Sequence, residues 1–166
     1  HAALDLEPLR AQVEGLLGPA IVVESRARER AVYLRRPDLG RQLAARDVEA
    51  LREVAGKEID LAIVIGDGLS ARAVNAHALP LIGVLKPRLD GLGLRLARPV
   101  IALGARVALG DEIGALVGAK AVAMLIGERP GLSSPDSLGA YLTFEPRLGR
   151  QDAQRNCVSN IRPQGL

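Results

Sequence analysis

Three apolar runs, each followed by a turn or loop that contains glycine, constrain the fold of this chain most strongly. They cover residues 59–65 (IDLAIVI), 99–104 (PVIALG) and 121–127 (AVAMLIG), and the first is rich in β-branched side chains. Runs of this length are typical of strands buried on both faces of a parallel sheet. Segments with a helical pattern, residues 71–85 and 111–119, separate the runs. The repetition predicts an α/β layered fold, Rossmann-like, with a mainly parallel sheet and helices on both faces.

The pattern is weaker before and after these runs. Apolar side chains at helical spacing predict a helix over residues 4–17, which Gly18-Pro19 ends. Further elements are expected as strands at residues 20–25 and 31–34, a helix at 40–55 and an edge strand at 141–146. The polar tail, residues 147–166, has no pattern of a full helix. We therefore expect a helical and extended N-terminal part, residues 1–55, and an α/β domain, residues 56–166.

Composition restricts both the core and the partners of the chain. Aromatic residues make up 2% of the sequence and Trp is absent, so the core must be aliphatic. The same scarcity leaves few platforms on which bases of single-stranded nucleic acid could stack. The net charge is +3, and charges of both signs alternate, as in residues 26–38. This mixture is typical of solvated faces, and we expect no binding to nucleic acid.

Cysteine content and hydropathy indicate the compartment. The single cysteine, Cys157, excludes an intrachain disulfide and favours a cytoplasmic protein. No apolar run reaches the roughly 18 residues of a membrane-spanning helix, and no signal peptide is recognisable. The chain starts at His1 rather than at Met, so we expect it to be trimmed or to have its natural start elsewhere.

The turn after the first run matches the G-x-G-x-x-A pattern of dinucleotide-binding proteins, from Gly66 to Ala71. A stand-alone α/β nucleotide-binding module is therefore the main alternative function. However, Asp67 brings a carboxylate to the position where a pyrophosphate should meet free N–H groups. Asp90, at about the distance of the ribose-binding carboxylate, lies in a turn rather than at the end of a strand. The structural interpretation is a tight turn in which Ser70 or Asp67 caps the helix.

Other chemistry-bearing residues are few. Two histidines and one cysteine, far apart, provide no metal-ligand spacing, and His77 is expected to be a surface or packing residue. We expect no catalytic residue and no metal site. Ligands of α/β sheets bind beyond the carboxyl ends of the strands, which places a candidate site in the loops at residues 66–70, 102–112 and 126–137. The long segment 127–139 is either a packed loop capped by Asp136 or Ser137, or a rim over a large polar ligand.

Several long motifs carry a resemblance to a known family. GERPGLSSPDSLGAYLT (residues 127–143) followed by RNCVSNIRP (155–163) resembles the C-terminal signature of ethanolamine ammonia-lyase small subunits. YLRRPDLGR (33–41), DGLSARAV (67–74) and RVALGDEIG (106–114) are similar to that family in the same order. The match covers most of the chain, from about residue 30 to its end.

The resemblance implies a function that the residues alone do not. It implies the small subunit of an adenosylcobalamin-dependent enzyme that converts ethanolamine to acetaldehyde and ammonia by a radical mechanism. The large subunit, a TIM barrel, would hold the substrate, and cobalamin would lie between the two subunits of a hetero-oligomer. Cobalamin contacts carry over onto Val107, Glu128 and Cys157, which makes residues 56–166 the cobalamin-contacting domain. Location in the cytoplasm, within a bacterial microcompartment, is implied too.

Two departures qualify what the resemblance implies. The Asp-x-His-x-x-Gly motif, by which a protein histidine replaces the lower base of cobalamin, is absent, so we expect cobalamin to bind base-on, with its own dimethylbenzimidazole on cobalt. Family members usually carry a longer N-terminal segment and a longer C-terminal extension. Contacts of the N-terminal part with the large subunit are therefore expected to be incomplete here.

Overall fold

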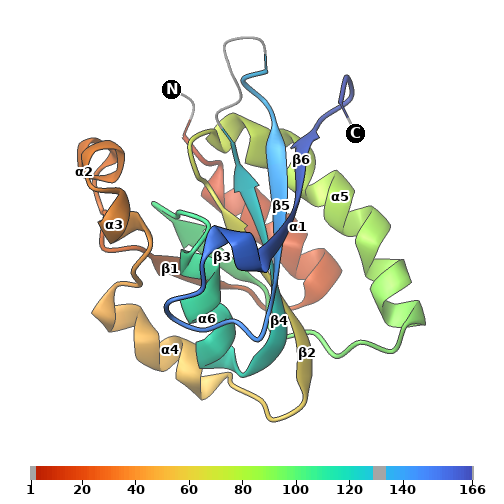
Figure 1. Cartoon of the computed structure of the whole chain (residues 1–166). Coiled ribbons are helices and arrows are strands. Elements are labelled where there is room, and N and C mark those ends of the chain that lie inside the picture. The colour runs from red at the N-terminus through yellow and green to blue at the C-terminus, as the bar shows by residue number, and fades with distance from the viewer. Residues whose placement is uncertain (1–2, 129–133, 166) are drawn as a thin grey trace.

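A six-stranded sheet in the order β1-β3-β2-β4-β5-β6 forms the centre of the molecule (Figure 1). The computed structural model describes residues 3–128 and 134–165. The strands are β1 Ile21–Glu24, β2 Ile59–Gly66, β3 Val100–Leu103, β4 Ala119–Gly127, β5 Leu138–Phe144 and β6 Arg155–Ile161. The first four of these run parallel, β5 is antiparallel to β4, and β6 is antiparallel to β5. The α/β class is confirmed, but the sheet is mixed and the expectation of a mainly parallel, Rossmann-like sheet is not confirmed.

The antiparallel half follows from the length of two connections. Residues 128–137 join β4 to β5, and residues 145–154 join β5 to β6. A parallel pair needs a crossover of about a dozen residues or more, usually with a helix. These connections are shorter, so each strand can only return beside the preceding one. The expected edge strand at 141–146 is consequently an inner strand, and β6 is the edge.

Helices cover both faces of the sheet (Figure 1). The α-helices are α1 Leu6–Leu17, α2 Arg30–Arg35, α3 Pro37–Gly40, α4 Val48–Glu53, α5 Ala71–Gly91 and α6 Leu109–Val117, and the 3-10 helices are η1 Ala45–Asp47 and η2 Asp152–Gln154. Helices α1 and α5 pack on the face that carries Leu61, Ile63 and Ile65 of β2. Helices α4 and α6 pack on the opposite face, with Ala62 and Val64. The alternation along β2 explains why its residues 61–65 are all apolar.

One predicted element is of the wrong type, and one strand was not predicted. Residues 31–34 were expected to be extended, but they lie in α2, where Tyr33 is buried and Leu34 is half exposed. A four-residue apolar segment fits either period, and only the burial pattern distinguishes them. The polar tail contains strand β6, which sequence analysis missed because most of its residues are exposed at the edge of the sheet.

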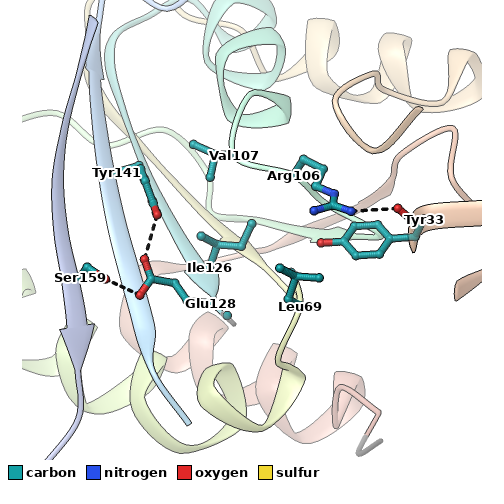
Figure 2. A pocket seen from close by; sticks show the side chains of 10 residues that line it. Tyr33, Leu69, Arg106, Val107, Ile126, Glu128, Tyr141 and Ser159 are labelled. Atoms are coloured by element: carbon teal, nitrogen blue, oxygen red, sulfur yellow. Dashed lines mark hydrogen bonds between the residues drawn. The ribbon is translucent and has the colours of Figure 1, made fainter. Parts of the chain in front are cut away.

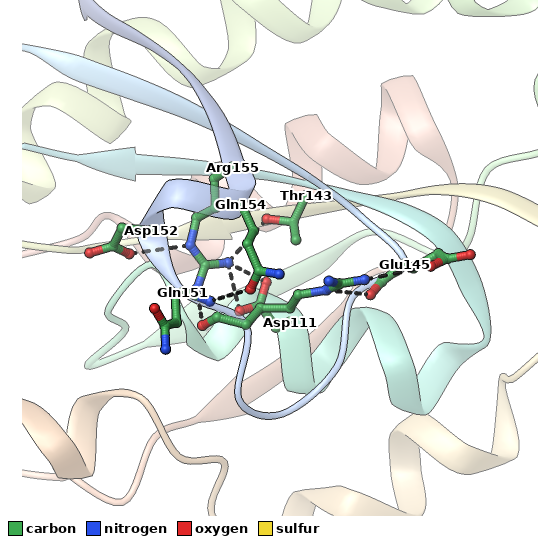
Figure 3. A network of polar contacts seen from close by, with 8 residues as sticks. Asp111, Thr143, Glu145, Gln151, Asp152, Gln154 and Arg155 are labelled. Carbon is green, nitrogen blue, oxygen red and sulfur yellow. Dashed lines mark hydrogen bonds and ion pairs between the residues drawn. The ribbon is translucent and has the colours of Figure 1, made fainter.

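A buried ion pair fastens the tail to the rest of the fold (Figure 3). Arg155, the first residue of β6, donates to the carboxylate of Asp111 in the first turn of α6. The same guanidinium donates to the carbonyl oxygen of Arg150 and to the hydroxyl of Thr143 on β5. These contacts fix the start of β6 against both α6 and β5.

The parallel strands end at one edge of the sheet. Gly66, the last residue of β2, is level with Ala102 of β3 and with Ile126 of β4. The loops that follow the three strands therefore meet above this carboxyl edge. Each of the three contains a segment that sequence analysis had singled out as a candidate site.

Candidate functional site

A cavity of about 320 Å³ lies where these loops meet, and we call it the carboxyl-edge cavity (Figure 2). It is lined by Tyr33, Gly68, Leu69, Arg106, Val107, Ile126, Gly127, Glu128, Tyr141 and Ser159. All three loops predicted from the sequence contribute to this lining. The sequence did not indicate three further lining residues, which are Tyr33 of α2, Tyr141 of β5 and Ser159 of β6. The sequence pattern did not reveal the structure or the neighbours of the segments that carry them. The centre of the expected rim, residues 129–133, lies outside the described residues.

Asp67 joins two of the loops that contribute to the cavity. Its Oδ1 accepts hydrogen bonds from the backbone N–H groups of Gly68 at 2.8 Å and Ala105 at 3.0 Å. Its Oδ2 accepts from the N–H of Gly104 at 3.0 Å. Burial raises the pKa of the Asp67 carboxyl, and these three bonds offset the rise only in part. Asp67 therefore holds the turn after β2 against the loop after β3.

Backbone N–H groups of the Gly66–Ala71 turn are already hydrogen-bonded within the protein. Besides the bond from Gly68 to Asp67, the N–H of Leu69 donates to the carbonyl oxygen of Gly127 at 2.9 Å. The N–H of Ala73 donates to the hydroxyl oxygen of Ser70, which confirms the helix-cap interpretation. A pyrophosphate would find these donors occupied. The arrangement weighs against the dinucleotide alternative.

Glu128 forms the acidic side of the cavity. Its carboxylate accepts hydrogen bonds from the hydroxyls of Ser159 at 2.6 Å, Tyr141 at 2.8 Å and Ser137 at 3.0 Å, and from the N–H of Asn160 at 3.4 Å. Burial acts to raise the pKa of Glu128, but the bonds from Ser159, Tyr141 and Ser137 outweigh it and hold the pKa below its ordinary value. Glu128 is thus an anion that ties the end of β4 to β5 and β6 (Figure 2).

The three residues expected to contact cobalamin do not lie equally close to the cavity. Val107 and Glu128 are both in the lining. Cys157 is exposed on β6, directly across the strand pair from Tyr141, and is not a lining residue. Burial chiefly raises the pKa of Tyr141, and the hydrogen bond to Glu128 and the neighbouring Cys157 raise it further. Cys157 therefore adjoins the cavity through the Tyr141 hydroxyl, which stays protonated as a donor to Glu128.

The opposite side of the cavity is cationic and aromatic. The guanidinium carbon of Arg106 lies 4.2 Å from the centre of the Tyr33 ring, and Arg106 Nη2 donates to the backbone oxygen of Tyr33 at 3.0 Å. The Tyr33 hydroxyl donates to the carbonyl oxygen of Ala105 at 3.1 Å. Val107, Ile126 and Leu69 lie between this side and Glu128 (Figure 2). The cavity thus combines an apolar floor with a cation on one side and an anion on the other.

His77, Asp136 and Ser70 do not form a nucleophilic site. His77 Nε2 lies 3.3 Å from Asp136 Oδ2, outside the lining of the cavity. The Ser70 hydroxyl donates to the backbone oxygen of Pro135 at 2.6 Å and caps α5. No cluster of three metal-ligating side chains occurs within residues 3–128 and 134–165. Over the same residues, no helix is long and apolar enough to span a membrane.

The mixed sheet and the carboxyl-edge cavity define an α/β protein with a cavity at the ends of its parallel strands, where sheets of this kind bind ligands. Comparison with known sequences gives the family. The family model of the ethanolamine ammonia-lyase light chain matches residues 1–166, and the chain belongs to this family.

Curated relatives carry the same description. The chain is 59% identical to the ethanolamine ammonia-lyase small subunit of Bradyrhizobium diazoefficiens, 55% identical to that of Rhodopseudomonas palustris and 48% identical to that of Pseudomonas fluorescens. Each comparison covers 100% of this chain. The chain spans 64%, 64% and 62% of the lengths of these relatives.

Proposed function

We propose that this chain is part of the small subunit of an adenosylcobalamin-dependent ethanolamine ammonia-lyase, and that its carboxyl-edge cavity is one wall of the cobalamin site. The observation that carries the proposal is the position of Val107 and Glu128. The resemblance assigns both to cobalamin, they are distant in sequence, and they line the same cavity. Family membership supports the reaction, in which ethanolamine yields acetaldehyde and ammonia.

The size and lining of the cavity fit one edge of cobalamin rather than the whole cofactor. Sites that enclose drug-sized ligands have volumes of about 300–1,000 Å³, and cobalamin is larger than such ligands, whereas this cavity measures about 320 Å³. An apolar floor between a guanidinium and a carboxylate suits a ligand with an apolar body and an amide-rich, phosphate-bearing periphery. A partner must cover the rest. When bound base-on, as the resemblance implies, the cofactor would supply the radical chemistry of the reaction, and Val107 and Glu128 would help to hold it.

Each of the three assigned residues has a separate role in the proposal. Val107 provides apolar contact on the floor. Glu128 already accepts four hydrogen bonds from the protein, so a ligand donor has to share or displace one of them. Its first effect is therefore to fix Tyr141 and Ser159 in the wall. Cys157 packs beside Tyr141, and none of the three acts as an acid, a base or a nucleophile.

The substrate site belongs to the partner in this proposal. Glu128, the carboxylate in the lining, already accepts four hydrogen bonds from the protein, and Asp67, in the turn after β2, is buried and accepts three, so neither is a free carboxylate for an ammonium group. We assign ethanolamine to the large subunit, a TIM barrel, and the assembly to a hetero-oligomer. The cytoplasm, or a bacterial microcompartment, is the proposed location.

A larger side chain that fills the cavity tests the proposal. The full-length small subunit, assembled with its large subunit, is titrated with hydroxocobalamin and followed by the visible absorbance of the corrinoid. Val107→Phe should fill the floor and weaken binding by about 10-fold or more, a cost typical of overpacking by several methylene groups. The matched control is Val84→Phe on α5, where the native side chain is 59% exposed.

Size-exclusion chromatography separates the loss of binding from the loss of assembly. If an assembled Val107→Phe complex binds cobalamin like the wild type, the cavity is not part of the cofactor site. Binding of a dinucleotide, without binding of a corrinoid, would favour the nucleotide-binding alternative instead.

A further inference from the structure

Arg106 is a cation for which the described residues provide no counter-ion. No carboxylate oxygen within residues 3–128 and 134–165 lies within ion-pair distance of its guanidinium. Its Nη2 donates to the Tyr33 backbone oxygen, and its Nε is buried without a hydrogen-bond partner among the same residues. A buried donor without a partner costs free energy, so its persistence needs a reason.

The guanidinium is held in a defined orientation at the cavity. It stacks on the Tyr33 ring. The guanidinium carbon of Arg30 also lies over this ring, 4.9 Å from its centre. The Arg106 backbone N–H donates to the carbonyl oxygen of Gly40 at 2.9 Å. A side chain on Gly40 would approach Arg106 Cγ to 2.7 Å. Arg106 is therefore fixed on two sides, and in Figure 2 it lies across the cavity from Glu128.

Stacking and pre-orientation are the features by which arginine recognises planar or tetrahedral anions. A guanidinium presents its donors in a rigid fork that matches the oxygens of a phosphate, and it is more weakly hydrated than an ammonium group. On the other side of the cavity, Glu128 carries a negative charge that repels an anion. An occupant with one anionic group should consequently turn that group toward Arg106.

We infer that Arg106 binds the phosphodiester of the nucleotide loop of cobalamin, supported by Tyr33, and so sets the orientation of the cofactor in the carboxyl-edge cavity. This inference rests on the proposed function, because it takes cobalamin as the occupant. It adds a specific residue and a specific group of the ligand to that proposal. Arg106 is a binding and positioning residue, with no part in proton or radical transfer.

A ligand that lacks the phosphodiester provides the test. Hydroxocobalamin and diaquocobinamide, which has no nucleotide loop, are titrated into the assembled full-length enzyme. The variants are Arg106→Met, Arg106→Lys and the control Arg98→Met, since Arg98 is exposed and lies before β3 at the opposite edge of the sheet. Arg106→Met should weaken cobalamin binding by about 10- to 100-fold, the usual effect of removing a charge-assisted hydrogen bond.

The two ligands should respond differently. Arg106→Met should leave cobinamide affinity unchanged, Arg106→Lys should lose part of the cobalamin affinity, and Arg98→Met should lose none. If cobinamide binds too weakly to titrate, ³¹P NMR replaces it: the phosphodiester signal of bound cobalamin should shift relative to free cobalamin in the wild type, and this shift should diminish in Arg106→Met.

The possible failures are distinguishable. Equal weakening of both corrinoids, or an unchanged ³¹P shift, would assign Arg106 a structural role and overturn the inference. Wild-type cobalamin affinity in Arg106→Met would overturn it while the proposed function stands. If the wild-type complex binds neither corrinoid, the proposed function itself fails. Binding of ADP that depends on Arg106, without corrinoid binding, would overturn both.

Discussion

Arg155 and Asp111 form an ion pair in which one nitrogen, Nη1 of Arg155, lies 2.6 Å from each carboxylate oxygen of Asp111 (Figure 3). Only 2% and 4% of the two side chains are exposed. Burial raises the pKa of Asp111, and the adjacent Arg155 offsets the rise only in part. The pair joins α6 to the start of β6, and β6 supplies Ser159 to the wall of the cavity. The site therefore depends on a contact made at the far end of the strand.

Removing the cation of this pair should strongly destabilise the fold. Arg155→Met leaves the Asp111 carboxylate buried without its partner, and loss of one member of a buried pair costs about 3–5 kcal/mol. The free energy of unfolding from urea titration measures the effect. Arg52→Met is the control, since its exposed pair with Glu49 should contribute less than about 1 kcal/mol.

The double replacement Asp111→Leu with Arg155→Met should be less destabilising than Arg155→Met alone, because no charge is then left buried. If the double variant has a lower free energy of unfolding than the single one, the pair itself stabilises the fold, and the loss in the single variant is not due to the unpaired carboxylate.

Gly68 should not tolerate a side chain. It has a φ of +59°, and a Cβ atom would collide with the carbonyl oxygen of Gly127. Gly68→Ala should therefore lower the free energy of unfolding by the backbone strain, about 1 kcal/mol or more, and by a further 1–3 kcal/mol or so for the collision. Gly93→Ala is a matched control, because Gly93 has a φ of +69° and no atom within 4 Å of the added Cβ. Equal losses in both variants would contradict the close approach of the two loops.

At acid pH, Glu128 should make the free energy of unfolding depend on pH. Because the pKa of Glu128 is lower in the folded chain than its ordinary value of 4.5, its carboxylate stabilises the fold above about pH 4.5. This stabilisation is lost as the pH falls through the depressed folded pKa. The difference in free energy of unfolding between the wild type and Glu128→Gln should be about 1–3 kcal/mol at pH 6 and should shrink below about pH 4.5.

Asp67 and Asp111 titrate in both proteins, so the difference isolates Glu128. A difference that grows on acidification would mean that the folded pKa of Glu128 is raised instead.

Cys157→Ser should have little effect on the cofactor. The thiol is exposed and adjoins the cavity only through the Tyr141 hydroxyl. The affinity of the assembled enzyme for hydroxocobalamin should change by less than about 2-fold, since serine is close to cysteine in size and keeps a small donor and acceptor at this exposed position. Loss of turnover with the cofactor still bound would require a chemical role for the thiol.

The sequence by itself determined the parts of this protein that depend on local periodicity. The strands β2, β3 and β4 and the helices α1, α5 and α6 were predicted because burial on one or two faces leaves a repeating pattern of apolar residues. The position of the site followed from the same pattern, since parallel strands bring their carboxyl ends, and the loops after them, to one edge. The family motifs added Val107 and Glu128, which do line the cavity there.

Tertiary structure alone decided which distant residues meet, in the cavity and in the contacts that support it. Arg106 and Tyr33 are separated by 73 positions, and Arg155 and Asp111 by 44, and no periodicity connects either pair. Strand β6 went unrecognised because an edge strand exposes most of its side chains and so needs no apolar pattern. Tyr33 was placed in an extended segment because four residues fit either period. Local physics sets the elements, whereas the pairing of buried charges and rings depends on how the elements pack, which a single sequence does not encode in any local pattern.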